Sequence, residues 1–275
     1  MKYCRSFMVH FSLLFFVVLL FLPLYLAFIA ASHDAAFMLQ KHLTLIPGKD
    51  FLPNLMTVLT KPLSLTGGTP IWRLLANSLC MALFIAVGKI ILALLSAFAL
   101  VYFEFPYKKF FFALILLTMM LPVEVRIMPT FQIAASLGLL NSFPGLTLPL
   151  LASATATFLF RQFFKTVPKE LVEAAKLDGA GPMAFFKDIL LPLSKTQIIA
   201  LFIILFVFGW NQYLWPLLIT TDTNMSTIVM GIHYLTAAAD EAPQWHLIMT
   251  IALIALFPPC FVVIALQRFF EKGIK

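Results

Sequence analysis

The chain has 275 residues, of which 62% are hydrophobic and only 11% are charged, and its mean hydropathy is +0.99. A water-soluble domain could not cover so much apolar surface, so the soluble fold classes are excluded. The formal net charge of +7 would suit a nucleic-acid-binding protein, but the basic residues lie in short segments beside apolar runs. Placement on the cytosolic side of a membrane explains them better. The composition therefore predicts an all-α integral membrane protein.

Six apolar runs are long enough to cross a bilayer as helices, since each crossing needs about 20 residues. The first run is longer than the apolar part of a signal peptide and no A-x-A site follows it, which favours an uncleaved span. The later runs begin near residues 74, 110, 146, 198 and 245, and the run at 198–219 is expected to form a single span. The predicted organisation is an N-terminal transmembrane helix (1–32), a periplasmic loop (33–72), a five-helix transmembrane domain (73–268) and a cytosolic tail (269–275).

The basic residues divide unequally between the loops if the N-terminus lies in the cytosol. Thirteen of the nineteen Lys and Arg residues then fall on the cytosolic side, and Lys89 lies within the second span. Only five fall on the outer side: Lys41, Lys49, Lys61, Arg73 and Arg126. Because positive loops remain inside, both termini and the loop 165–197 are predicted to be cytosolic.

The longest polar interruption in the C-terminal two-thirds of the chain is Glu170–Pro192. Glu173 lies early in a predicted helix, where a carboxylate complements the helix dipole, and Gly179 ends that helix. Pro182 opens a second short helix, which Pro192 is expected to end before the next span. The adjacent Ala174 and Ala175 leave a shallow surface that another protein can approach. The pattern indicates a cytosolic helix–turn–helix that contacts a soluble partner.

This stretch resembles the EAA loop of binding-protein-dependent ABC importer permeases, with every fixed position of the motif at the family's spacing. The resemblance implies the type I ABC importer permease fold and a loop that couples the permease to a cytosolic ATPase. The residues to which it gives this coupling role are Glu173, Ala174, Ala175, Asp178, Gly179, Ile189, Leu191 and Pro192.

Three further stretches, at residues 121–130, 151–164 and 209–222, are similar to permeases of bacterial sn-glycerol-3-phosphate importers in the carbohydrate-importer group of this family. The similarity implies a permease subunit that moves sn-glycerol-3-phosphate, or a related glycerophosphodiester, from a periplasmic binding protein across the inner membrane. It also implies a heterodimer with a second homologous permease and two ATPase subunits. A sister permease for a sugar or oligosaccharide stays open as the alternative, because one sequence decides substrate poorly.

Other functional classes lack their required signals. Gly88-Lys89 has neither the upstream glycine nor the hydroxyl residue of a phosphate loop, so the chain is not itself the ATPase. A secondary transporter would usually show internal repeats and has no use for a cytosolic docking loop. We predict no catalytic residues, no cofactor and no metal site, since neither the histidines nor the three isolated cysteines have ligand spacing.

Several polar residues within the spans are candidates for the substrate pathway. Lys89 is expected to face the interior of the bundle, because an ammonium in the middle of a span needs a cavity or a partner. Small residues on the same span, such as Ala82 and Ala86, predict close helix packing. The residues that we assign to the pathway are Lys89, Glu124, Arg126, Asn211, Gln212 and Tyr213.

Arg126 lies between Pro122 and Pro129, which should kink or end the third span. If the segment is helical, Glu124 points away from Arg126; if it is extended, the two side chains share a side. Arg126 either reaches the outer headgroups or binds an anionic substrate, since a guanidinium matches a phosphate. The polar patch Ala152–Thr157 is interpreted as a stripe facing other helices.

Overall fold

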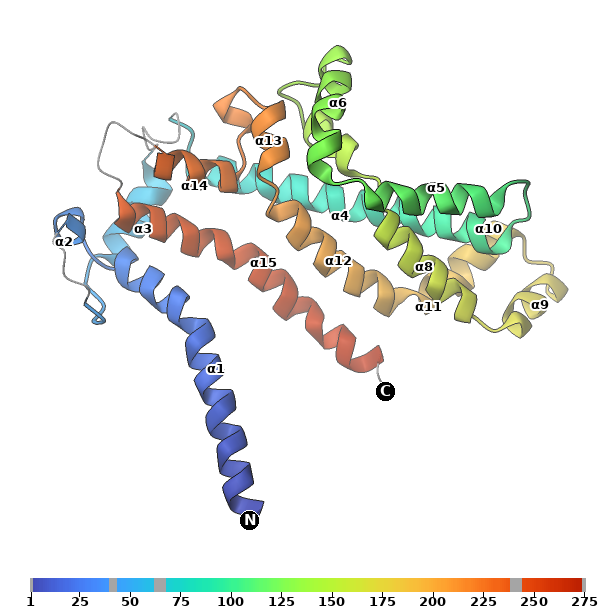
Figure 1. Cartoon of the computed structure of the whole chain (residues 1–275), viewed down its shortest axis with the longest axis horizontal. Helices are drawn as coiled ribbons and strands as arrows, with labels where there is room; N and C mark the ends of the chain where they lie inside the picture. Colours follow the sequence, from blue (N-terminus) through green and yellow to red (C-terminus); the bar gives the residue numbers. More distant parts are fainter. Residues whose placement is uncertain (1, 40–43, 62–67, 238–243, 274–275) are drawn as a thin grey trace. The chain divides into compact units, whose positions relative to one another are not determined.

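The computed structural model describes residues 2–39, 44–61, 68–237 and 244–273, and within these residues the regular structure is helical, with no strand (Figure 1). The all-α prediction is confirmed. Three described helices are long and apolar enough to cross a bilayer: α1 (Lys2–Ala31), α4 (Ile71–Tyr102) and α15 (Trp245–Gly273). Three further pairs of helices are long and apolar enough if each bent pair is counted as one span. The described residues then contain up to six membrane spans, the number that the sequence predicts.

The breaks within the three pairs lie at residues that interrupt the apolar runs, namely Pro122, Ser153 and Ser194. Pro122 ends one helix and precedes the next, as expected for a residue without a backbone N–H. The pairs are α5 (Lys108–Met120) with α6 (Val123–Ser136), bent by 105°, Phe143–Leu150 with α8 (Ala154–Thr166), bent by 50°, and Pro182–Leu193 with α12 (Lys195–Trp210), bent by 72°.

The chain divides into two compact units, one of residues Met1–Leu75 and Thr227–Pro258 and the other of residues Ala76–Ser226 and Pro259–Lys275. The first unit holds α1, α2 (Ala35–Leu39), α3 (Phe51–Thr60), α14 (Ile228–Ala237) and the start of α15. The shorter elements of the second unit are α7 (Phe143–Thr147), α9 (Lys169–Leu177), α10 (Pro182–Phe185), a π-helical turn (Phe186–Leu190), α11 (Leu191–Leu193), α13 (Leu214–Ile219) and 3₁₀ turns at Leu148–Leu150 and Thr223–Met225.

In the first unit, the connection after α1 is folded back onto the end of that helix. The amide nitrogen of the buried Asn54, on α3, donates to the backbone oxygens of Ala31 and His33 at 2.9 and 2.8 Å. The backbone N–H of Gly48 donates to Ser32 Oγ at 2.8 Å. These bonds satisfy buried polar groups at the helix end. Two short helices, α2 and α3, therefore lie in this connection.

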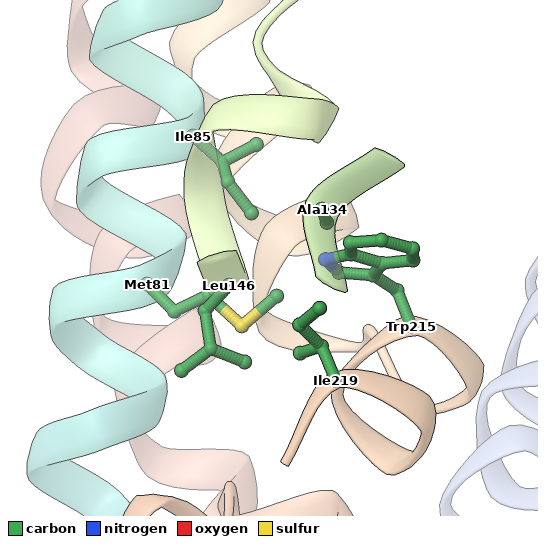
Figure 2. Packing of buried hydrophobic residues seen from close by; sticks show 6 residues of the cluster. All are labelled: Met81, Ile85, Ala134, Leu146, Trp215 and Ile219. Atoms are coloured by element: carbon green, nitrogen blue, oxygen red, sulfur yellow. The ribbon is translucent and has the colours of Figure 1, made fainter. Parts of the chain in front are cut away.

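In the second unit, a hydrophobic cluster joins α4, α6, α7 and α13 (Figure 2). Trp215 lies at its edge and donates its indole N–H to the backbone oxygen of Gly145 at 3.0 Å. The bond matters because a buried indole N–H without an acceptor would cost free energy. The members of the cluster are Met81, Ile85, Ala134, Leu146, Trp215 and Ile219.

The close packing predicted for the second span is found where α12 crosses α4. Ala82 and Ala86 are fully buried. A Cβ placed on Gly209 would lie 2.9 Å from the Cα of Ala82, so the two backbones meet with no room for a side chain. Small residues at a crossing allow such an approach between helices.

Two predicted boundaries are wrong. Residues 198–219 do not form one helix, because α12 ends at Trp210 and α13 begins at Leu214. Pro192 does not end its helix either. The helical backbone continues through Pro192 to Leu193, and the chain turns at Ser194 instead.

Candidate functional site

The predicted helix–turn–helix of the EAA stretch is present. Helix α9 ends in a glycine-dependent cap: Gly179, with a φ of +76°, donates to the oxygen of Lys176 at 3.1 Å, and Ala180 donates to the oxygen of Ala175 at 2.9 Å. This pair of bonds is the Schellman motif, in which a glycine takes the left-handed conformation. Its effect is to fix the direction in which the chain leaves α9 toward α10.

One side of α9 packs onto the protein and the other side is open. Glu173, Ala174 and Asp178 are exposed, and Leu177 is 88% exposed. Ala175 is only 5% exposed. The expectation that both alanines form a shallow outer surface is therefore wrong, since Ala175 belongs to the inner side and only Ala174 to the outer.

The segment after the turn anchors this helix pair to the end of α4. The rings of Phe185 and Tyr102 lie 5.2 Å apart, and those of Phe186 and Phe98 lie 4.9 Å apart. Leu190 is fully buried. The helix pair is consequently attached to α4 by packed rings rather than by a loose loop. Of the remaining EAA-motif residues, Ile189 is half-buried, whereas Leu191 and Pro192 are exposed.

A second feature of the same unit is a pair of adjoining cavities of about 180 and 440 Å³. Four residues line both cavities: Lys89, Arg126, Ala152 and Phe208. Lys89 is 7% exposed, and its ammonium lies 4.0 Å from the centre of the Phe208 ring. Gln212 and Trp215 also line the smaller cavity, so the cluster of Figure 2 supports one wall of it.

Among the described residues that line these cavities, Lys89 and Arg126 are the charged ones and none is an Asp or a Glu. The ring of Phe208 compensates Lys89 by about 0.5–2 kcal/mol. Placing a lysine at the centre of a membrane helix costs about 2.5–3.5 kcal/mol. The ring therefore offsets only part of that cost.

The structure brings together three of the six pathway candidates, namely Lys89, Arg126 and Gln212. Asn211 is exposed and Tyr213 is half-buried, and neither lines these cavities. The side chain of Glu124 lies outside the described residues. The backbone from Val123 is helical, which removes the extended alternative for this segment. Among the described residues, no group of three His, Cys, Asp or Glu side chains is placed to hold a metal ion.

Sequence reasoning missed the contributions of Phe208 and of residues 153–155 to these cavities. Ser153, Ala154 and Thr155 form the N-terminal end of α8 and line the larger cavity. The patch Ala152–Thr157 does face inward, but its first half borders a cavity instead of another helix. Polar residues before an apolar run, such as Ser153 before α8, indicate where a helix starts. They give no information about which part of the protein the start of the helix faces.

Comparison with known proteins decides the family. Residues 89–275 match the family described as the binding-protein-dependent transport system inner membrane component. The chain belongs to this family. It is a permease component of a bacterial inner-membrane import system rather than an enzyme, and it works with an ATPase and a binding protein, as predicted.

Relatives of this permease cover almost its full length. The sn-glycerol-3-phosphate transport system permease proteins UgpE of Salmonella typhi and Brucella melitensis are 51% and 48% identical over 96% of the chain and 94% of their own length. That of Yersinia pestis is 52% identical over the same shares. In fold, the permease matches a bacterial ABC transporter involved in the import of the acidic polysaccharide alginate, with a TM-score of 0.83, 20% identity and 98% coverage of both chains.

Proposed function

We propose that this permease carries sn-glycerol-3-phosphate, or a related glycerophosphodiester, from a periplasmic binding protein into the cytoplasm. The observation that carries the proposal is the 51% identity, over 96% of the chain, to a relative named for sn-glycerol-3-phosphate transport. The cavities lined by Lys89 and Arg126 support it, because they favour an anionic substrate over a neutral sugar.

In this proposal the permease forms a heterodimer with a second homologous permease, and two ATPase subunits dock on the cytosolic side. ATP binding closes the ATPase dimer, and α9 moves with it as a rigid body. The coupling residues are those of the EAA stretch, with Glu173, Ala174 and Asp178 on the exposed side of the turn. The packed rings of Phe185 and Phe186 pass the motion to α4 and change the side to which the pathway opens.

The experiment that tests the substrate is ATP-driven uptake by proteoliposomes that contain both permeases and the ATPase, with the binding protein outside. Labelled sn-glycerol-3-phosphate should accumulate, and labelled maltose, a neutral sugar of the alternative class, should not.

From the charge distribution we infer an orientation with both termini and residues 165–197 in the cytosol. In a variant whose native cysteines are replaced by serine, Lys49→Cys should react with a membrane-impermeant thiol reagent in intact cells. Lys176→Cys should react only after the cells are opened. Both side chains are exposed, so burial does not explain a difference. Labelling of residue 176 in intact cells would contradict this orientation.

A further inference from the structure

Three positive features meet at the adjoining cavities of the second unit. Lys89 supplies a buried ammonium from α4, and Arg126 supplies a guanidinium from α6. The third feature is the N-terminal end of α8, a helix of thirteen residues whose Ser153, Ala154 and Thr155 line the larger cavity. A helix N-terminus carries partial positive charge and unpaired backbone N–H groups, and both favour an anion.

The surroundings of the three features select for the same charge. No Asp or Glu is among the described residues that line either cavity. Lys89 is more than nine-tenths buried, and its ammonium lies over the ring of Phe208. A buried ammonium that faces a cavity without a carboxylate is balanced best by an anion that enters the cavity.

We propose that Lys89, Arg126 and the N-terminal end of α8 together bind the phosphate group of the substrate as it crosses the membrane. A phosphate ester suits this set because it carries up to two negative charges and three acceptor oxygens. The Arg126 guanidinium can bind the phosphate through two N–H groups in a forked geometry. The Lys89 ammonium binds the phosphate as a compact charge and gives up its contact with the Phe208 ring. This inference rests on the proposed function, since it names the part of the pathway that recognises the phosphate.

The test uses the complete complex, with both permeases, the ATPase and the binding protein, in proteoliposomes. Lys89→Gln and Arg126→Gln should each lower the rate of sn-glycerol-3-phosphate uptake by at least about tenfold, since each removes a charge-assisted contact. Lys89→Arg and Arg126→Lys should retain part of the rate. Uptake should stay unchanged in the control Lys109→Gln, which removes an exposed charge from α5.

A double variant separates a shared phosphate site from two independent structural roles. If both cations bind one phosphate, Lys89→Gln with Arg126→Gln should be far less impaired than the product of the two single losses. Wild-type rates in both single variants would overturn the proposal. Losses that multiply in the double variant would also overturn it.

A second measurement decides the case in which the variants fail to assemble. Ala152 is exposed and lines both cavities, so Ala152→Cys in an otherwise cysteine-free chain reports on their occupancy. sn-Glycerol-3-phosphate should protect this cysteine from a thiol reagent, and glycerol should not. If the cysteine is protected without any solute and the protection varies with the lipid, a lipid headgroup occupies the cavities and the proposal is overturned. If sn-glycerol-3-phosphate gives no protection, the proposal is also overturned.

The same cysteine keeps the two proposals distinguishable. If wild-type complex takes up no sn-glycerol-3-phosphate, the proposed function fails. Inorganic phosphate is then used as the probe. Protection of the cysteine by phosphate would support the anion site, and equal labelling with and without phosphate would overturn it.

Discussion

Replacing Gly179 with valine should reduce transport by about tenfold or more while the permease still reaches the membrane. Gly179 has a φ of +76°, a conformation that costs a residue with a side chain about 1–2 kcal/mol and a β-branched residue more. The strain is released if the turn opens, and α9 then no longer has the orientation in which we propose that it contacts the ATPase. Because the proposed coupling needs α9 to keep its direction, the loss of transport should exceed the loss of stability.

Gly181→Ala is the matched control for that variant. Gly181 follows two residues later with a φ of −70°, and a Cβ placed there has no atom within 4 Å. Transport by Gly181→Ala should therefore be near that of wild type. The comparison is made as uptake per amount of permease in the membrane. Normal uptake by Gly179→Val would contradict the coupling role of this turn.

Replacing Leu177 with aspartate should weaken binding of the ATPase to the permease pair by about 10- to 100-fold. Leu177 is 88% exposed at the end of α9, beside the exposed Asp178. An exposed leucine that a partner covers contributes about 1.5–3 kcal/mol, and each 1.4 kcal/mol is tenfold in the dissociation constant. The added carboxylate also increases the negative charge at this end of the helix.

The measurement is the dissociation constant of purified ATPase for the permease pair in nanodiscs, at fixed salt. Lys169→Ala provides the control, because it changes an exposed residue at the opposite end of α9. We expect that control to change binding by less than about threefold, as is usual for an exposed charge. Unchanged binding of the ATPase by Leu177→Asp would exclude α9 as its docking helix.

Local signals in the sequence were sufficient for the EAA stretch. Gly179 and Pro182 each act on the backbone at their own position, so the turn and the start of α10 could be predicted without tertiary contacts. The inner position of Ala175 could not, because Ala174 and Ala175 are chemically identical. Only the packing of α9 decides which of them is covered.

The bends of the spans were harder to predict than the spans themselves. Apolar composition reports that a segment avoids water, but it carries no information about direction, so residues 198–219 were interpreted as one helix. The polar residues at 211–213 fall between α12 and α13 and mark the actual break. In the third span, Pro122 gave the break correctly, since a proline acts on its own backbone.

For the cavities, the charged members were predictable and the neutral ones were not. A lysine within a span needs a cavity or a partner wherever it lies, and Lys89 meets both expectations through the cavities and Phe208. Phe208 is one of thirty phenylalanines in an apolar chain. Its position over Lys89 depends on the crossing of α12 and α4, which is a tertiary property.

We propose that this permease moves an organic phosphate across the membrane and that ATP hydrolysis drives the movement. The most direct measurement is uptake of labelled sn-glycerol-3-phosphate by proteoliposomes with the complete complex, with ATP inside and loaded binding protein outside. We predict that accumulation of the label requires both ATP and the binding protein. Unlabelled sn-glycerol-3-phosphate should compete with this uptake, and maltose should not. ATP-dependent accumulation of maltose with none of sn-glycerol-3-phosphate would contradict the account.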